Sequence, residues 1–317
     1  MPDYIQRKTT AQINALARSF KKTFKQAGNK AVSDWEDYYA EYADEDAELE
    51  KQYKAGDITK KEWTAGRVAL MGAGIIAGGA LVKSITGYIT NAGKSASNQI
   101  NSKLDDVFTL AHDRSGYEIE EQARIRTAFD VVSKSALEVY KRNEQPFSMA
   151  KWAQGKASKY YSGKVHTVIK HGLEAGWSVD DIARSLRDIC NMGDRSALRT
   201  ARTLINGAEN AGRQYAYNQA SEMGLKLVKE WVATVDDRTR DSHALIDGEV
   251  VDIDEDFSNG LEYPGDSSGD DDEVINCRCA MVSHVQGFDR GSDVDYRESE
   301  SYQEWRAERE ARAGAEE

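Results

Sequence analysis

Residues 195–224 read RSALRTARTLINGAENAGRQYAYNQASEMG, and the character of the chain changes where this stretch ends. We interpret the stretch as one long helix closed by Gly224, since glycine commonly follows the last turn of a helix. Beyond it, Trp231, Val232 and Val235 form a strand-like run, and further short apolar runs follow between Gly- and Asp-rich turns. The sequence therefore predicts an α+β fold: predominantly long α-helices over about residues 1–230, then a small β-containing module and a charged tail.

This division predicts four parts of the chain. Residues 1–160 are expected to form a helical arm, because three prolines in 317 residues leave room for long helices. Residues 161–230 form a second helical part, and residues 231–288 form a small acidic α+β unit, called the module below. Residues 289–317 are charged and low in apolar residues, so we expect a flexible tail, with a solvated terminal helix as the alternative.

Local signals place helices within the first two parts. Apolar spacing predicts helices over residues 5–28 and 35–53. Thr59 and Glu62 match a capping box, so another helix is expected to begin there. The polar residues 112–116 are expected to separate two helices.

The net charge of −12 is distributed unevenly along the chain. Residues 1–34 hold seven Lys or Arg and two Asp, a charge of +5, whereas the module holds fifteen acidic residues and three Arg, a charge of −12. Such an imbalance is typical of parts that have different partners. The alternative is that the acidic loops keep the protein soluble.

Residues 68–82 read VALMGAGIIAGGALV and carry no charge. The run is shorter than the roughly 20 residues that a membrane-spanning helix needs. Gly74 and Gly78 have the GxxxG spacing that permits close contact between helices. We expect a buried or self-associating helix and treat a membrane as an unlikely partner.

Two of the three cysteines, Cys277 and Cys279, lie one residue apart in VINCRCAMVSHV (274–285). Successive side chains of a strand point to opposite faces, so both thiols are expected to point the same way. Thiolates are zinc ligands, and His243 is the candidate third ligand, with a carboxylate, His284 or water as the fourth. The alternative is that both thiols are small buried side chains and no metal is bound, so zinc is a candidate cofactor only.

The same residue types are compatible with catalysis, but the pattern does not favour it. A nucleophilic cysteine needs one activated thiol rather than two in register. A metal hydrolase or nuclease built on His243, Cys277 and Cys279 would need a base, for which Asp236 or Asp241 is available. We therefore predict that the protein is not an enzyme, and we interpret the acidic run 270–273 as surface charge.

The positions that bracket these candidates carry a resemblance to a known family. Their order is W-x-A-x-x-D-x-R-T-R-x-x-H-x-x-x-D-G, then a loop with P-G at 264–265, then I-N-C-R-C. This pattern resembles the phage head morphogenesis family, also called Mu F-like minor head proteins, over about residues 165–287. The motif positions are Trp231, Asp236, Arg238, Thr239, Arg240, His243, Asp247, Gly248, Cys277 and Cys279.

Two departures from the family pattern concern the long helix and the thiol pair. The family usually has Ala-Arg-Thr-Glu in the helix, where this chain has Leu204 in place of the glutamate. Some relatives have cysteines at the positions of Arg240 and His243, which implies a four-thiolate zinc site in those proteins. This chain keeps only the histidine of that pair.

The resemblance implies a minor virion protein of a tailed phage, packaged in the head interior near the portal after assembly in the host cytoplasm. The expected partner is the portal protein, with the scaffold or major capsid protein and packaged DNA as further candidates. The family has a proposed role in genome ejection, and genome packaging is the other role we expect.

The cations Lys21, Lys22 and Lys25 are the candidate contacts to portal or DNA, because clustered cations favour phosphate. The alternative is that these lysines belong to an ordinary solvated helix face. Two alternative functions of the protein stay open, namely the metal-dependent hydrolase or nuclease above and a membrane-active ejection protein that uses residues 68–92.

Overall fold

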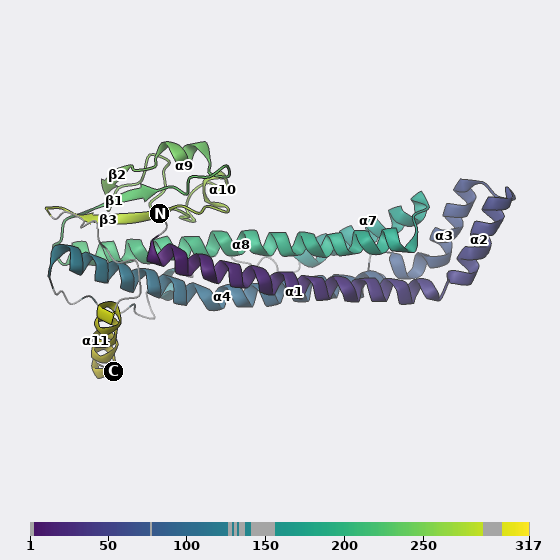
Figure 1. Ribbon diagram of the computed structural model, residues 1–317. Coiled ribbons are helices and arrows are strands. Elements are labelled where there is room, and N and C mark those ends of the chain that lie inside the picture. The colour runs from purple at the N-terminus through teal and green to yellow at the C-terminus, as the bar shows by residue number, and fades with distance from the viewer. Residues whose placement is uncertain are drawn as a thin grey trace. The chain divides into compact units, whose positions relative to one another are not determined.

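The computed structural model describes residues 3–76, 78–125, 129, 132, 137–140, 156–287 and 300–316. Figure 1 shows long helices and one small sheet, so the predicted α+β fold is confirmed. The helices are α1 (Tyr4–Ala40), α2 (Ala43–Ala55), α3 (Lys60–Ile75), α4 (Ala80–Ala123), α7 (Lys156–Ala175), α8 (Val179–Glu222), α9 (Asp241–Leu245), α10 (Asp271–Val274) and α11 (Glu300–Glu316). The strands are β1 (Leu227–Val232), β2 (Val250–Asp252) and β3 (Ala280–Val285).

The chain divides into two compact units. Unit 1 contains Met1–Leu16, Gln99–Ser148 and Arg199–Glu317, and unit 2 contains Ala17–Asn98 and Met149–Leu198. Helices α1, α4 and α8 each contribute residues to both units. The expected limits at residues 160 and 230 fall inside α7 and β1.

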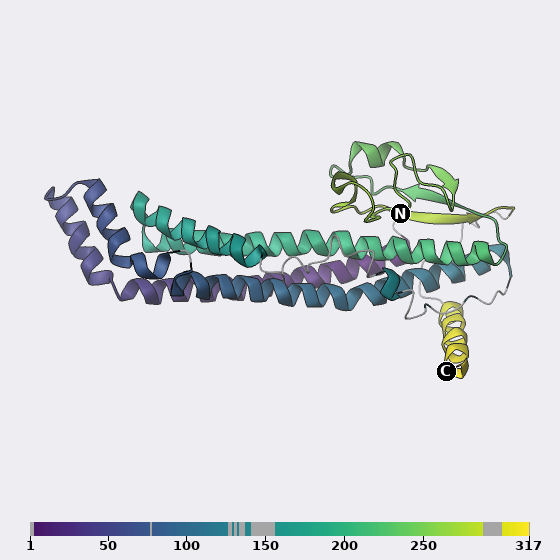
Figure 2. The ribbon, with the colours of Figure 1, turned by 180° about the vertical axis from the view of Figure 1, so that it is seen from behind.

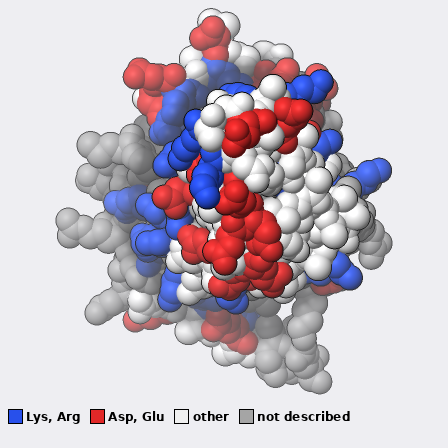
Figure 3. Space-filling model, turned by 90° about the vertical axis from the view of Figure 1, so that its right-hand side faces the viewer, with Lys and Arg blue, Asp and Glu red and all other residues white. Residues whose placement is uncertain are grey.

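In unit 2, α2 and α3 form a hairpin whose second helix begins as predicted. The Thr59 hydroxyl accepts from the Glu62 N–H at 3.2 Å, and the Glu62 carboxylate accepts from the Thr59 N–H at 2.8 Å. A buried ion pair joins the two helices, with 2.9 Å between Arg67 Nε and Asp46 Oδ1. Figure 3 views the molecule from the side of the α2–α3 hairpin and shows acidic side chains gathered there. The exposed carboxylates of α2 are Asp44, Glu45 and Glu48.

The apolar run 68–82 does not form one helix. It is divided between α3, which ends at Ile75, and α4, which begins at Ala80. Gly74 lets a tyrosine approach, because an added Cβ would lie 2.5 Å from the Tyr38 ring, whose hydroxyl donates to the Met71 carbonyl at 2.7 Å. Among the described residues, no single helix is long and apolar enough to cross a membrane. Helices α3 and α4 taken together have the length and composition of a membrane span, but the pair is bent by 58°.

In unit 1, α4 runs without interruption through residues 112–116, so the expected break there is wrong. The polar side chains of this stretch are buried because each has a polar partner, one of them distant in the sequence. The imidazole of His112 lies 2.9 Å from the Gln219 side chain on α8 and 3.0 Å from the Asp113 carboxylate. Arg114 Nε donates to Glu118 at 2.9 Å. Paired in this way, polar residues continue a helix that their sequence alone suggests should end.

The sheet is antiparallel with the strand order β2-β1-β3, and Trp231 on β1 lies opposite Met281 on β3. β1 begins at Leu227, four residues before the expected start of the module. Figures 1 and 2 both show the sheet along one side of α8, with α4 on the other side. Buried Trp231, Phe257 and Met281 belong to the core that the sheet shares with α4 and α8.

The open edge of β3 is hydrogen-bonded by side chains of α8. Asn210 donates to the Cys279 carbonyl at 3.1 Å and accepts from the Met281 N–H at 3.2 Å, which copies the pattern of a neighbouring strand. Asn206 donates to the same Cys279 carbonyl, and Arg213 donates to the Met281 carbonyl, both at 3.1 Å. Residues 206, 210 and 213 lie on one face of a helix, so α8 supplies hydrogen-bond partners to backbone groups of an edge that would otherwise be unpaired.

The last helix, α11, packs against α4, and the Glu120 carboxylate receives two of its side chains. Glu120 accepts from Trp305 Nε1 at 2.6 Å and from Arg309 at 2.9 and 3.0 Å. Trp305 and Arg309 are both 3% exposed. The tail thus contains a helix over Glu300–Glu316, the alternative to a wholly flexible tail, and this helix is packed through Trp305 and Arg309 rather than fully solvated; residues 289–299 lie outside the described residues.

Replacing Asn210 with Leu is expected to lower the free energy of unfolding by about 2–4 kcal/mol, because the buried Met281 N–H and Pro264 carbonyl lose their partner. Urea unfolding followed by tryptophan fluorescence measures the change. The matched control is Asn191→Leu, since Asn191 is exposed on the same helix. An equal loss in both variants would contradict the edge-pairing role.

Candidate metal centre

The three predicted zinc ligands meet in unit 1. His243 lies on α9, and Cys277 and Cys279 lie in the segment between α10 and β3. Nδ1 of His243 is 3.7 Å from Cys277 Sγ and 3.4 Å from Cys279 Sγ. All three side chains are buried, and their ligand atoms lie within 4.8 Å of one another. We call this group the His–Cys cluster.

The distances within the His–Cys cluster fit a tetrahedral ion. Zinc bound to sulfur at about 2.3 Å and to nitrogen at about 2.0 Å would hold these two ligand atoms about 3.5 Å apart. The observed separations of 3.4 and 3.7 Å lie on either side of that value. Among the described residues, no fourth His, Cys, Asp or Glu joins the group. The arrangement therefore offers a soft metal three protein ligands.

A carboxylate orients the histidine. Nε2 of His243 lies 2.9 Å from Glu273, which also accepts from the Ser242 hydroxyl at 3.0 and 3.1 Å. Donation from Nε2 to Glu273 leaves the Nδ1 lone pair facing the sulfurs, as in the carboxylate–histidine–metal arrangement of zinc proteins. The edge of Trp231 packs on the ring, 5.1 Å between centroids.

Glu273 is the functional residue that the sequence interpretation missed. It was assigned to a surface run of charge over residues 270–273, and it is half-buried on α10. No spacing relates it to His243, since 30 residues separate them. Only the folded arrangement identifies which carboxylate of the run faces inward.

The two thiols have opposite proton affinities. The hydrogen bond from Cys277 lowers the pKa of Cys279 to about 5 despite its burial. The same bond to Cys279, together with burial, raises the pKa of Cys277 above its usual value.

His284, a candidate fourth ligand, does not join the cluster. It sits on β3 and its Nε2 lies 2.5 Å from the Glu230 carboxylate on β1. The candidate base Asp236 is also engaged elsewhere. It accepts from Arg278 Nη2 at 2.6 Å, and this pairing holds the pKa of the carboxyl well below its usual range. A base so weakened does not support hydrolysis at this place.

The remaining motif residues build the loop that carries His243. Asp247 accepts from the Ala233 N–H at 2.8 Å, and the Gly248 N–H donates to the Trp231 carbonyl at 2.9 Å. Gly248 has a positive φ of 81°, which favours glycine. Further bonds run from Thr239 to the Thr234 carbonyl, from Arg240 to the Ile275 carbonyl, and from the Arg238 N–H to Asp236.

Two other sequence features have a plain structural outcome. Leu204, which stands where the family usually has glutamate, is 2% exposed in the core. Lys21, Lys22 and Lys25 are exposed on α1 in unit 2, opposite the buried Phe20 and Phe24. The three lysines thus form the solvent-facing side of the helix.

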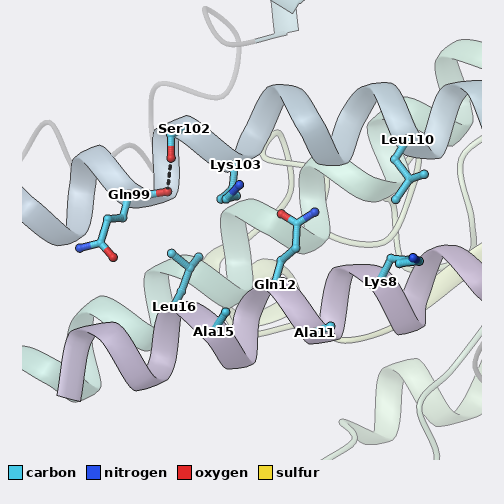
Figure 4. Close-up of a pocket in the computed structure, with 9 residues that line it drawn as sticks. All are labelled: Lys8, Ala11, Gln12, Ala15, Leu16, Gln99, Ser102, Lys103 and Leu110. Carbon is cyan, nitrogen blue, oxygen red and sulfur yellow. Dashed lines mark hydrogen bonds between the residues drawn. The ribbon is translucent and has the colours of Figure 1, made fainter. Parts of the chain in front are cut away.

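A cavity of about 530 Å³ lies between α1 and α4 within unit 1 and is lined by none of the cluster residues (Figure 4). Leu16 and Leu110 contribute apolar walls, and Lys8 and Lys103 contribute cations. Lys103 Nζ pairs with Asp106 at 3.0 Å, and the Lys8 ammonium lies 5.3 Å from the centre of the Tyr4 ring. Because both cations have partners, the cavity does not identify a ligand.

Comparison with known proteins matches residues 163–282 to the family described as Phage Mu protein F like protein. The chain is 26% identical over 199 residues to the minor head protein GP7 of Bacillus phage SPP1, which covers 61% of this chain and 64% of that protein. It is 34% identical over 145 residues to an NAD(+)--arginine ADP-ribosyltransferase EFV of Enterococcus faecalis, which covers 44% of this chain and 30% of that protein.

A further relative, the uncharacterized protein YqbB of Bacillus subtilis, is 27% identical over 122 residues, 37% of this chain and 40% of that protein. The chain therefore spans between 30% and 64% of the length of these relatives. No solved structure matches the chain. The resemblance found in the motif is confirmed by the family match and by the phage relative.

The cluster geometry leads us to expect about one zinc ion per chain by elemental analysis of the purified protein. Glu273→Gln is expected to weaken zinc binding about 10–100-fold, because the histidine loses its orienting partner. Asp271→Asn, an exposed neighbour on α10, is the matched control.

Zinc affinity should fall as the pH is lowered, since the ligands must lose protons to bind. Absence of metal, with an unchanged melting temperature in Cys277→Ser, would refute the site.

Proposed function

Because the chain belongs to the Mu F-like family of phage minor head proteins through residues 163–282, we propose that it associates with the portal and is packaged inside the capsid during head assembly. Contacts to scaffold or major capsid protein belong to the same proposal, as does a role in genome packaging or ejection. The observation that carries it is the family match, supported by a phage relative that is itself named a minor head protein.

The construction of the module supports a binding role rather than a catalytic one. The His–Cys cluster is buried, so it holds a metal out of reach of a substrate. Asp236, one of the two candidate bases, is paired with Arg278. We therefore propose that zinc, when bound, fastens the loop of His243 to the segment of Cys277 and Cys279, and that it performs no hydrolysis.

The similarity to a protein named an ADP-ribosyltransferase does not alter this proposal. The shared stretch covers 30% of that protein, so the activity in its name belongs to a chain of which most is not matched here. The proposed function rests instead on the family match and on the phage relative. An assay for ADP-ribosylation of arginine by the purified chain tests the alternative directly.

The proposal predicts that the protein is present in purified virions and co-purifies with the portal protein from infected cells. A mass-spectrometric inventory of CsCl-purified virions checks the first part, and affinity purification through a tagged portal checks the second. Protease treatment of intact virions separates an interior position from an exterior one, because an interior protein survives it. Absence from virions would overturn the proposal.

Contact with packaged DNA is expected to depend on the basic face of α1. Replacing Lys21, Lys22 and Lys25 together by Gln should weaken duplex DNA binding and reduce the slope of log K against log salt by up to about 3, since each phosphate contact contributes about 0.9. The matched control replaces Lys51, Lys54 and Lys61, three exposed lysines of the same unit. Equal effects of the two triple variants would contradict a specific basic face.

A further inference from the structure

We propose that Arg202, Arg238 and Arg278 form a binding site for a phosphate group. The site lies on the surface where α8 meets the turn after β1 and the segment before β3. We call these residues the arginine cluster. It is separate from the metal ligands and from the lysines of α1, and the family function does not require it.

Backbone contacts bring the three arginines together within unit 1. The Asn276 N–H donates to the Thr203 hydroxyl at 2.8 Å, which holds the chain before Arg278 against the turn of α8 that carries Arg202. The Thr234 hydroxyl donates to the Arg278 carbonyl at 2.6 Å, which ties this segment to the turn after β1. Arg238 follows in that turn.

One carboxylate serves two of these guanidinium groups. Asp236 accepts from Arg278 Nη2 at 2.6 Å and from Arg238 Nη2 at 3.2 Å. The side chain of Arg238 is 68% exposed and that of Arg278 is 24% exposed, so both keep donors that face solvent. Asp236 therefore gathers two cations while neutralising only one charge.

Arg202 has no carboxylate partner among the described residues. It is half-buried on α8, and its burial, followed by the charges of Arg238 and Arg278, lowers its pKa. The three guanidinium groups and one carboxylate leave a surplus of two positive charges, although the module that holds Arg238 and Arg278 has a net charge of −12. Like charges held together in a folded protein raise its free energy, and an anion bound between them would offset that cost.

A phosphate group fits this surplus better than a second carboxylate. Guanidinium groups bind phosphate through paired N–H donors, and a phosphate monoester offers three acceptor oxygens and a charge of about −1.5 to −2 at neutral pH. A carboxylate offers two oxygens and one charge, and Asp236 already fills that role. The exposed acids Asp237 and Asp241 lie close along the chain and would repel an extended polyanion, so we expect a compact phosphate rather than duplex DNA.

Calorimetric titration of the full-length protein with inorganic phosphate, against chloride at equal ionic strength and pH, tests the site. Wild-type protein is expected to bind phosphate, and Arg202→Gln is expected to lose about tenfold or more in affinity, the value of one charge-assisted hydrogen bond. Arg199→Gln is the matched control, since Arg199 is exposed one turn earlier on α8 and carries the same charge. Its affinity should change by less than about twofold.

A thermal unfolding measurement in chloride separates ligand binding from a structural role. Arg202→Gln should melt no lower than wild type, because it relieves repulsion between like charges, and it should lose the upward shift that phosphate gives to wild type. No phosphate binding by wild type, or equal losses in the Arg202 and Arg199 variants, would overturn the proposal. A lower melting temperature of Arg202→Gln in chloride would overturn it as well.

Two further arms identify the source of the phosphate. Binding of inorganic phosphate without binding of a short DNA duplex is expected and would assign the site to a free or terminal phosphate. Duplex binding with the same dependence on Arg202 would instead contradict the compact ligand and assign the site to the nucleic-acid backbone. An acidic peptide of glutamates is the remaining arm. If it binds through Arg202 while phosphate does not, the proposal is overturned and the surface is a protein contact.

Discussion

The hydrogen bonds between α8 and the open edge of β3 are the constraint on which the rest of unit 1 depends. A three-stranded sheet with a β2 of three residues is marginal by itself, and its outer strand exposes backbone groups that need partners. Asn210 supplies both a donor and an acceptor, so it substitutes for one residue of a fourth strand. Arg213 extends the contact and is itself buried between the carboxylates of Asp3 and Glu209. A helix face thus completes a sheet.

The geometry of the His–Cys cluster follows from this contact. The Cys279 carbonyl is held by Asn206 and Asn210, and the preceding Asn276 N–H is held by Thr203. The two thiols are therefore fixed relative to α8 before any metal binds. His243 approaches from the other side on a loop whose shape is set by Asp247 and Gly248. A bound ion would connect two segments that the helix and the loop have already brought within about 3.5 Å of one another.

The relatives give this arrangement a context. Stretches similar to this chain occur in proteins with different names, and they make up between 30% and 64% of those proteins. The matched region, residues 163–282, contains most of α8, the sheet and the cluster. The basic face of α1 lies outside the matched region, whereas the arginine cluster lies inside it.

The sequence by itself determined the fold class, the helix start at Thr59 and the identity of the three candidate ligands. These follow from local rules, since helix caps, strand alternation and residue chemistry act over a few positions. The tertiary structure alone decided that α4 continues through His112, that Glu273 faces His243 and that Arg202 stands beside two other arginines. Each of those outcomes depends on a partner at least 30 residues away, and the pairing of a buried polar group is settled by what packs against it rather than by its neighbours in the chain.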